Sequence, residues 1–199
     1  MFYVLRFFAY LPLKILFPTK IIGKKNKIKK GRMILCCNHQ SNNDVPLIAI
    51  SFHRRFKYMA KVSLFKNKFI GWVLRMLGAY PVNREEVDLV AMKKTLGYLK
   101  NEKAVCLFPE GTRVTEHEKS SLKNGAIIFS LKTKSPILPC IFLKKPRVFR
   151  RNKFIIGEPL KLYEMEQFKD KKVNDELIEL GKEILFEKMN ELYTLEKRG

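Results

Sequence analysis

Acidic residues are almost absent from the first 84 residues of this chain, which hold 17 lysines and arginines and a single acid, Asp44. This part therefore has a net charge of +16, whereas residues 85–199 hold 23 basic and 18 acidic residues, a net charge of +5. Such a basic surface favours an anionic partner, which could be a nucleic acid, a phospholipid surface or a phosphorylated substrate.

Cysteine patterns typical of disulfide-rich or metal-binding proteins are also missing. The chain has four cysteines, Cys36, Cys37, Cys106 and Cys140, with no C-x-x-C pair among them. The adjacent Cys36 and Cys37 would point to opposite faces of a strand, so no metal site is expected. Because each cysteine lies in or beside an apolar run, we expect small buried residues in the strands of a reduced cytoplasmic protein.

A long apolar run is missing from the N-terminus as well, although MFYVLRFFAYLPLKILFPTK is rich in aromatic residues. Its longest uncharged apolar run, Phe7–Leu13, has seven residues, whereas a membrane-spanning helix needs about 20. Arg6 interrupts the apolar part, which is not typical of a signal peptide. Two interpretations stay open: a segment that lies in a membrane interface, or a helix that packs on the protein's own core.

The next stretch, KIIGKKNKIKKGR at residues 20–32, holds seven basic residues and no acid. Beside an aromatic segment, this composition predicts attraction to anionic lipid. Nucleic-acid binding is the competing interpretation, but no zinc finger, recognition-helix pattern or RNA-binding signature accompanies the charge, so no nucleic-acid partner is expected. We therefore expect a membrane-associating segment at residues 1–32 and a catalytic domain at residues 33–199.

With 199 residues, 46% of them hydrophobic, the chain is expected to form one globular core. Short apolar runs alternate with segments of helical periodicity. The expected strands are Met33–Cys37, Tyr58–Val62, Ala79–Val82, Ala104–Phe108, Ile137–Phe142 and Phe154–Ile156. The expected helices are Val45–Ser51, Leu64–Leu77, Glu85–Lys100, Asn124–Thr133 and Val173–Leu195. Strands separated by helices predict an α/β fold with a largely parallel central sheet flanked by helices, preceded by an N-terminal membrane-interface helical segment.

Three polar stretches follow expected strands: NHQSNND after residues 33–37, NR after residues 79–82, and PEGTR after residues 104–108. Ligands of such sheets bind at the carboxyl ends of the strands. These stretches are therefore the strongest candidates for chemistry, and we expect them to meet at one edge of the sheet.

His39 and Asp44 are the candidate catalytic pair in the first stretch. In a strand-to-helix turn, the imidazole can fold back onto the carboxylate, which would fix the tautomer of the ring. The alternative is that Asp44 only caps the helix that begins near Val45, while His39 only fills the turn. The spacing alone does not decide between the two.

The other stretches supply candidate ligands for a phosphate. In PEGTR, Gly111 would let the backbone approach a ligand closely, Thr112 adds a hydroxyl, and Arg113 offers a planar fork suited to phosphate. Glu110 could hold a substrate hydroxyl or fix the arginine. Arg84 ends the block GAYPVNR beside another strand.

Together, NHQSNND, GAYPVNR, FPEGTR and ILPC resemble, in this order, the sequence blocks of the glycerolipid acyltransferase family. The resemblance is to its 1-acylglycerol-3-phosphate acyltransferase (lysophosphatidic acid acyltransferase) branch. The matching positions are His39 with Asp44, residues 78–84, residues 108–113, and Ile137 with Pro139. The blocks span residues 33–142, and FPEGTR is highly specific.

The resemblance implies transfer of a fatty acyl group from a thioester to 1-acylglycerol-3-phosphate, with phosphatidic acid as the product for phospholipid biosynthesis. His39 would be the general base, Asp44 would orient it, and Arg84, Glu110, Gly111, Thr112 and Arg113 would bind the substrate. Acyl carrier protein or coenzyme A would carry the donor, with no metal and no other cofactor. The expected location is the cytoplasmic face of the cell membrane, with peripheral or monotopic attachment to anionic phospholipid.

Two alternatives stay open at this point. The nearer is a related acyltransferase that acts on glycerol-3-phosphate or on another lysolipid. The more distant is a basic non-enzymatic protein that binds nucleic acid or membranes. A serine nucleophile has no support, because the chain lacks a G-x-S-x-G motif.

Overall fold

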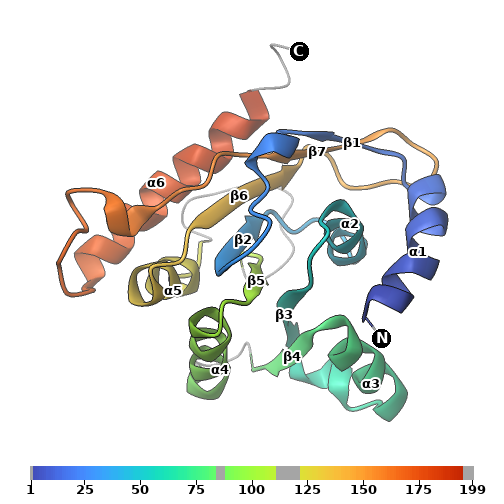
Figure 1. Cartoon of the computed structure of the whole chain (residues 1–199), viewed down its shortest axis with the longest axis horizontal. Coiled ribbons are helices and arrows are strands. Elements are labelled where there is room, and N and C mark those ends of the chain that lie inside the picture. Colours follow the sequence, from blue (N-terminus) through green and yellow to red (C-terminus); the bar gives the residue numbers. More distant parts are fainter. Residues whose placement is uncertain (1, 84–87, 111–121, 195–199) are drawn as a thin grey trace.

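The computed structural model describes residues 2–83, 88–110 and 122–194 of the chain. Its centre is a seven-stranded sheet in the order β1-β7-β6-β2-β5-β3-β4 (Figure 1). The strands are β1 Thr19–Ile22, β2 Met33–Cys37, β3 Phe56–Lys61, β4 Ala79–Val82, β5 Ala104–Leu107, β6 Ile137–Phe142 and β7 Asn152–Ile156. The α-helices are α1 Phe2–Leu16, α2 Asp44–Ser51, α3 Lys68–Leu77, α4 Leu89–Lys100, α5 Gly125–Thr133 and α6 Asp175–Thr194. Short 3-10 helices are η1 Lys24–Asn26, η2 Val62–Phe65 and η4 Leu162–Glu164.

The sheet is largely parallel, as the sequence predicts. Strands β2 to β6 run in one direction, since β2 pairs in parallel with β5 and β6, and β3 pairs in parallel with β4 and β5. Strand β7 is antiparallel to β6, and β1 lies parallel to β7 at the edge. The carboxyl ends of β2, β5, β3 and β4 therefore lie along one edge of the sheet.

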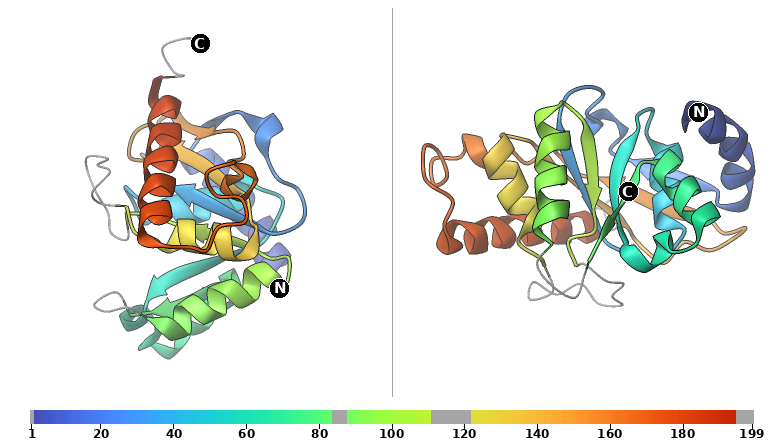
Figure 2. Two further views of the ribbon diagram at one scale, coloured as in Figure 1. Left: turned by 90° about the vertical axis from the view of Figure 1, so that its left-hand side faces the viewer. Right: turned by 90° about the horizontal axis from the view of Figure 1, so that it is seen from below.

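Helices cover both faces of the sheet, which gives three layers (Figures 1 and 2). Along β2 the side chains alternate: Ile34 and Cys36 belong to the core under α4, α5 and α6, whereas Leu35 and Cys37 belong to the core on the side of α2. Successive side chains of β2 thus enter opposite cores, and all of them are apolar, which is the pattern of a strand that is buried on both faces.

The C-terminal helix α6 packs against the first of these cores, as expected from its apolar spacing. Its buried side chains are Leu177, Ile178, Leu185, Met189 and Leu192. Gly181 lets the helix approach α5 closely, because a Cβ atom there would lie 2.6 Å from the Cγ2 atom of Ile127.

Strand β1 was not predicted, and it lies within the segment that we expected to associate with a membrane. The sequence TKII contains an exposed lysine, so it reads as part of the basic stretch rather than as a strand. It becomes a strand because β7 offers a free edge, against which Thr19 lies opposite Asn152 and Ile22 opposite Ile155.

The expected helix Leu64–Leu77 is divided in two. Residues Val62–Phe65 form η2, and α3 begins at Lys68. The reason is Asn67, whose side-chain oxygen accepts a hydrogen bond from the Ile70 N–H at 3.0 Å and so caps α3. Helix α4 begins at Leu89 behind the cap Asp88, and residues 85–87 of the expected helix lie outside the described residues.

Helix α1 lies beside α2. Its side chains Tyr3, Val4, Phe7, Phe8, Leu11 and Ile15 are exposed, whereas Phe17 just after the helix is buried. Among the described residues, no helix combines the length and apolarity that crossing a membrane requires. Membrane association of this segment stays a prediction.

Gly78 makes the bend between α3 and β4, within the block that resembles the family. Its φ of +99° lies in the left-handed region, and a Cβ atom there would lie 2.3 Å from the Phe56 carbonyl oxygen. Only glycine fits this bend without displacement of β3.

We expect Gly78→Ala to lower the free energy of unfolding by at least about 2 kcal/mol, because backbone strain and a backbone clash act together. Gly97→Ala is the matched control, since Gly97 is helical with nothing within 4 Å of its added Cβ atom. That change should stabilise the protein by about 0.5–1 kcal/mol. Urea unfolding of both variants checks the prediction, and equal stabilities would contradict the described bend.

Candidate active site

Two neighbouring strands bring the first and third polar stretches together. Strands β2 and β5 pair in parallel with Cys36 opposite Leu107, so the residues that follow each strand emerge side by side. The turn after β2 carries His39, and the turn after β5 carries Glu110. The predicted convergence at the carboxyl edge is confirmed for these two stretches.

His39 and Asp44 form a hydrogen-bonded pair, as the first interpretation of their spacing expects. The ring Nδ1 lies 2.9 Å from Asp44 Oδ2. Asp44 is fully buried and His39 is nearly so. An ionised carboxylate only accepts hydrogen bonds, so Nδ1 carries the proton and donates it, which leaves Nε2 as the acceptor of the ring. This is the tautomer that a general base requires.

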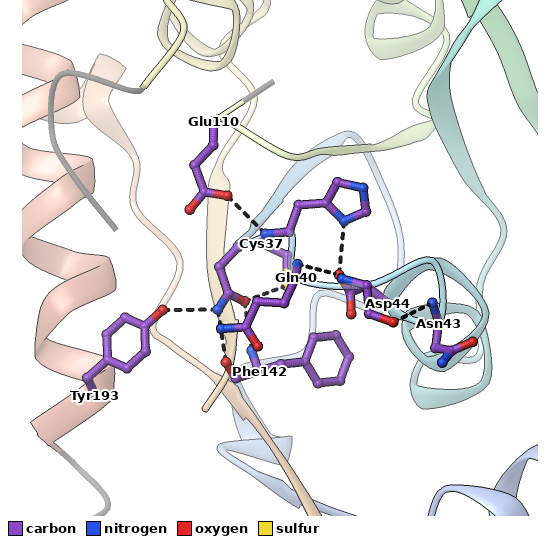
Figure 3. A network of polar contacts seen from close by, with 10 residues as sticks. Cys37, Gln40, Asn43, Asp44, Glu110, Phe142 and Tyr193 are labelled. Carbon is purple, nitrogen blue, oxygen red and sulfur yellow. Dashed lines mark hydrogen bonds and ion pairs between the residues drawn. The ribbon is translucent and has the colours of Figure 1, made fainter. Parts of the chain in front are cut away.

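Asp44 holds the whole turn in place. Its Oδ2 accepts hydrogen bonds from the backbone N–H groups of Gln40 and Ser41, each at 2.8 Å, in addition to the bond from His39 (Figure 3). The alternative interpretation, in which Asp44 only caps α2, is wrong: Asn43 occupies the cap position without a side-chain bond, and Asp44 is the first helical residue. The carboxylate turns back toward the strand because three N–H donors converge there.

Glu110 and Phe108 fix His39 from the other side. The Glu110 Oε2 atom accepts a hydrogen bond from the His39 backbone N–H at 2.9 Å (Figure 3), and the carboxylate is buried. The Phe108 ring stacks on the imidazole with a centroid distance of 4.0 Å. The structure thus places Glu110 against the backbone of the candidate base, and its predicted contact with substrate stays a prediction.

Asn38, which the sequence analysis did not select, ties the site to β6 and α6. Its side-chain amide donates to the Phe142 carbonyl at 2.9 Å and accepts from the Phe142 N–H at 2.8 Å, so it extends the β2–β6 ladder by one more step. It also donates to the Tyr193 hydroxyl of α6 at 3.0 Å (Figure 3). Burial raises the pKa of Tyr193 to about 12, so this hydroxyl stays neutral. The signal available in the sequence was an asparagine directly after the apolar run that forms β2.

The four cysteines lie in the strands as free, buried thiols, as predicted. Burial raises the pKa of each thiol, including that of Cys37, two residues before His39. A thiol that stays protonated is a poor nucleophile, so the site offers a base and no activated cysteine. Within the described ranges, no group of His, Cys, Asp and Glu side chains could hold a metal ion.

A cavity of about 790 Å³ opens beside His39, between the sheet and the helices α1, α2 and α3. His39 and Phe108 form part of its wall. Most of the remaining wall is apolar, with Val45, Pro46 and Ile50 from α2 and Val73, Leu74 and Leu77 from α3. The volume lies in the range of small-molecule binding sites, and the apolar lining is compatible with a hydrocarbon chain.

The predicted phosphate ligands cannot be placed in this geometry. Arg84, Gly111, Thr112 and Arg113 lie outside the described residues. Their described neighbours, Asn83 at the end of β4 and Glu110 after β5, lie at the same edge of the sheet as His39. The role of the four residues stays a prediction.

Comparison with known proteins assigns this geometry to a family. Residues 19–143 match the family model described as Acyltransferase. The chain is 32% identical to the 1-acyl-sn-glycerol-3-phosphate acyltransferase of Bacillus subtilis over 71% of this chain and 73% of that protein. It is 32% identical to the protein of the same name from Saccharomyces cerevisiae over 89% of this chain and 64% of the yeast protein.

A solved structure agrees with the fold. The 1-acyl-sn-glycerophosphate (LPA) acyltransferase of Thermotoga maritima superposes with a TM-score of 0.71 over 98% of this chain and 78% of that chain, at 24% sequence identity. At that identity the likeness shows the fold alone. The matched region contains β1 to β6, the His39–Asp44 pair and Glu110, and with this match the chain belongs to the acyltransferase family.

Proposed function

We propose that this protein transfers a fatty acyl group from a thioester to the free hydroxyl of 1-acyl-sn-glycerol-3-phosphate and thereby forms phosphatidic acid. The observation that carries the proposal is the His39–Asp44 pair in the wall of an apolar cavity. The names of the relatives in Bacillus subtilis and Saccharomyces cerevisiae support the choice of acceptor.

The pair performs the proton transfer. Nε2 of His39 takes the proton of the acceptor hydroxyl as its oxygen attacks the thioester carbonyl carbon, while Asp44 supports the imidazolium that forms. When the tetrahedral intermediate collapses, the carbon–sulfur bond breaks and the imidazolium returns the proton to the leaving thiolate. No acyl-enzyme is required, because the acceptor oxygen is itself activated.

Binding of both substrates restricts where this chemistry occurs. The cavity between α1, α2 and α3 receives the acyl chain, and the arginines at positions 84 and 113 hold the acceptor phosphate through charge-assisted hydrogen bonds. The donor is a thioester of acyl carrier protein or of coenzyme A, and the reaction needs no further cofactor.

One assay tests the proposal directly. Purified protein is incubated with glycerol-3-phosphate and a panel of lysolipids, each with acyl carrier protein and coenzyme A thioesters, and the products are identified by mass spectrometry. Phosphatidic acid from 1-acyl-sn-glycerol-3-phosphate is the expected product. Acylation of glycerol-3-phosphate alone would reassign the protein to the nearest alternative activity.

His39→Ala should lower kcat by about 10²- to 10⁴-fold, because the general base is removed. His53→Ala is the control, since His53 is exposed on the surface, and it should leave kcat unchanged. Steady-state kinetics of each purified variant checks this prediction. Wild-type turnover in the His39 variant would rule out the mechanism.

Asp44→Asn should lower kcat and also the stability. The asparagine oxygen can take the place of Oδ2, but it is neutral and accepts the three N–H bonds more weakly. The amide N–H groups would be buried where Oδ1 has no hydrogen-bond partner among the described residues. The expected loss in the free energy of unfolding is about 1–3 kcal/mol. Kinetics and urea unfolding are measured together, and unchanged stability would show that the buried carboxylate does not hold the turn.

Arg113→Ala and Arg84→Ala should raise the KM for lysophosphatidic acid about 10- to 100-fold and the KM for the donor far less, because one charge-assisted contact to the phosphate is lost. Arg151→Ala removes the same charge from an exposed site in the β6–β7 region and is the matched control. Equal weakening of both substrates would assign the two arginines to the fold or to the donor.

We also propose that the first 32 residues hold the protein on the cytoplasmic face of the membrane, with the exposed aromatic residues of α1 in the interface and lysines near anionic lipid. Between β1 and β2 the exposed lysines are Lys24, Lys25, Lys29 and Lys30. Lys27 belongs to the same stretch, but it is only half-buried and its ammonium group donates to the Ser51 carbonyl at 2.6 Å, so the substitutions described next leave it unchanged.

Replacing these four lysines with glutamine should weaken sedimentation with anionic vesicles sharply, since each charge contributes about 1 kcal/mol near the surface. The control variant replaces four exposed lysines elsewhere, Lys93, Lys100, Lys171 and Lys172. Turnover of a short-chain, water-soluble acyl pair should survive in both variants. Equal loss of binding in both would mean that total charge, rather than this segment, attracts the membrane.

A further inference from the structure

Helix α3 exposes large apolar side chains that neither the fold nor the proposed chemistry uses. The side chains of Phe69 and Trp72 are 72% and 52% exposed, and their rings stack at a centroid distance of 6.3 Å. Ile70 on the same helix and Val62 on η2 are also exposed, as is Leu64, which in addition lines the cavity. Exposed apolar residues gathered in this way mark a surface that contacts a partner or a membrane.

The apolar face of α3 continues into the cavity wall. Val73, Leu74 and Leu77 line the cavity, and Phe69 and Ile70 lie one helical turn before Val73 and Leu74, on the same face of the helix. A surface helix usually buries its apolar face, yet Phe69 and Ile70 stay exposed. The cavity therefore accounts for only part of this face, and its exposed part needs a separate explanation.

Basic residues surround this apolar surface. Lys61, Lys66, Lys68 and Arg75 are exposed, and the sequence between residues 45 and 84 contains no acid at all. The Arg75 guanidinium lies over the Phe65 ring at 5.2 Å, where it covers apolar area and keeps its charge at the rim. Apolar rings with cations at the rim match a bilayer whose hydrocarbon lies beneath anionic phosphates.

The position of α3 agrees with this match. Helices α1 and α3 lie on the same side of the sheet (Figure 1), and both line the cavity, α1 through Ala9 and Leu13. Helix α1 exposes Phe7, Phe8 and Leu11. The cavity is thus bounded by two helices that each present apolar side chains to the outside.

We infer that η2 and α3, residues 62–77, form a second membrane-contact surface, which inserts Phe69 and Trp72 into the interface of an anionic bilayer. Together with α1, it would hold the cavity against the lipid from which an acyl chain enters. The inference rests on the proposed function in one respect, that the substrates are lipids.

Trp72 is the only tryptophan of the chain, so its fluorescence reports on this surface alone. With vesicles of phosphatidylcholine and phosphatidylglycerol in equal parts, we expect a blue shift of the emission, and quenching when the acyl chains carry bromine. The control moves the reporter to the other face of the sheet through Trp72→Phe and Val90→Trp, since Val90 of α4 is 77% exposed. That variant should sediment with the vesicles without a blue shift or quenching.

Phe69→Ser tests the contribution of the surface and keeps the reporter. The vesicle partition coefficient should fall about tenfold, the scale of losing one aromatic side chain from an apolar contact. Leu89→Ser on α4 is the matched control, because Leu89 is also highly exposed, and it should leave partition unchanged. Turnover of a short-chain, water-soluble acyl pair in both variants verifies that each is folded.

The outcomes separate this inference from the proposed function. Quenching of Trp72 without formation of phosphatidic acid would support the surface and reject the acceptor. Phosphatidic acid formation and vesicle sedimentation with unquenched Trp72 would overturn the inference. Two further results would overturn the inference. A blue shift of Trp72 that needs no lipid and grows with protein concentration would show that the surface binds a second copy of this chain. A blue shift with acyl carrier protein alone would show that the surface binds the donor protein.

Discussion

The buried carboxylate of Asp44 is the constraint on which the active site depends. It lies at the start of α2, behind the turn that follows β2, and a buried charge in that position is stable only if donors converge on it. The chain supplies three donors within five residues, from the His39 ring and from two backbone N–H groups. All three bonds go to Oδ2, whereas Oδ1 is buried without a hydrogen-bond partner in the described part of the chain. The bonds that stabilise the carboxylate also fold the turn, fix the ring tautomer and orient the imidazole. The hydrogen bonds to Asp44 thus serve both the fold of the turn and the position of His39.

The burial of Asp44 also affects the electrostatic field around the protein. Asp44 is the only acid in the first 84 residues, and it is fully covered. The described residues of this part thus expose cations and no carboxylate of their own, although Glu102 pairs with Arg32. Its long-range attraction is directed to anionic partners and is weakened by salt. The less basic remainder of the chain includes α4, α5 and α6, on the opposite face of the sheet from the cavity.

The sequence predicts the parts of this structure that local patterns determine. The apolar runs locate β2 and β6 to the residue, because a strand buried on both faces is apolar throughout. The edge strand β4 is also located to the residue, between Gly78 and Asn83. Strand β1 escaped prediction, since it exists only through pairing with β7, more than a hundred residues away. The break before α3 could have been predicted, because Asn67 is a preferred N-cap residue.

The site shows the same division. The contact between His39 and Asp44 lies within one turn, so the sequence offered it as one of two interpretations, and the structure decides for it. The bond from the His39 N–H to Glu110 and the stacking of Phe108 depend on β5 lying next to β2, which no local pattern specifies. Asn38 was missed for a related reason, because its role appears only when β6 and α6 are in place.

A base that activates a lipid hydroxyl can also activate water, so the fold has to favour acyl transfer over hydrolysis of the thioester. The geometry does this by limiting access to His39: Asp44 occupies one ring nitrogen, Phe108 covers one ring face, and the side chain is nearly buried. The adjoining cavity is lined mostly by apolar groups, which bind a hydrocarbon chain better than water. In the proposed mechanism, transfer is fast only when a bound acceptor places its hydroxyl at Nε2, so that phosphate binding is a condition of the chemistry as well as a source of affinity.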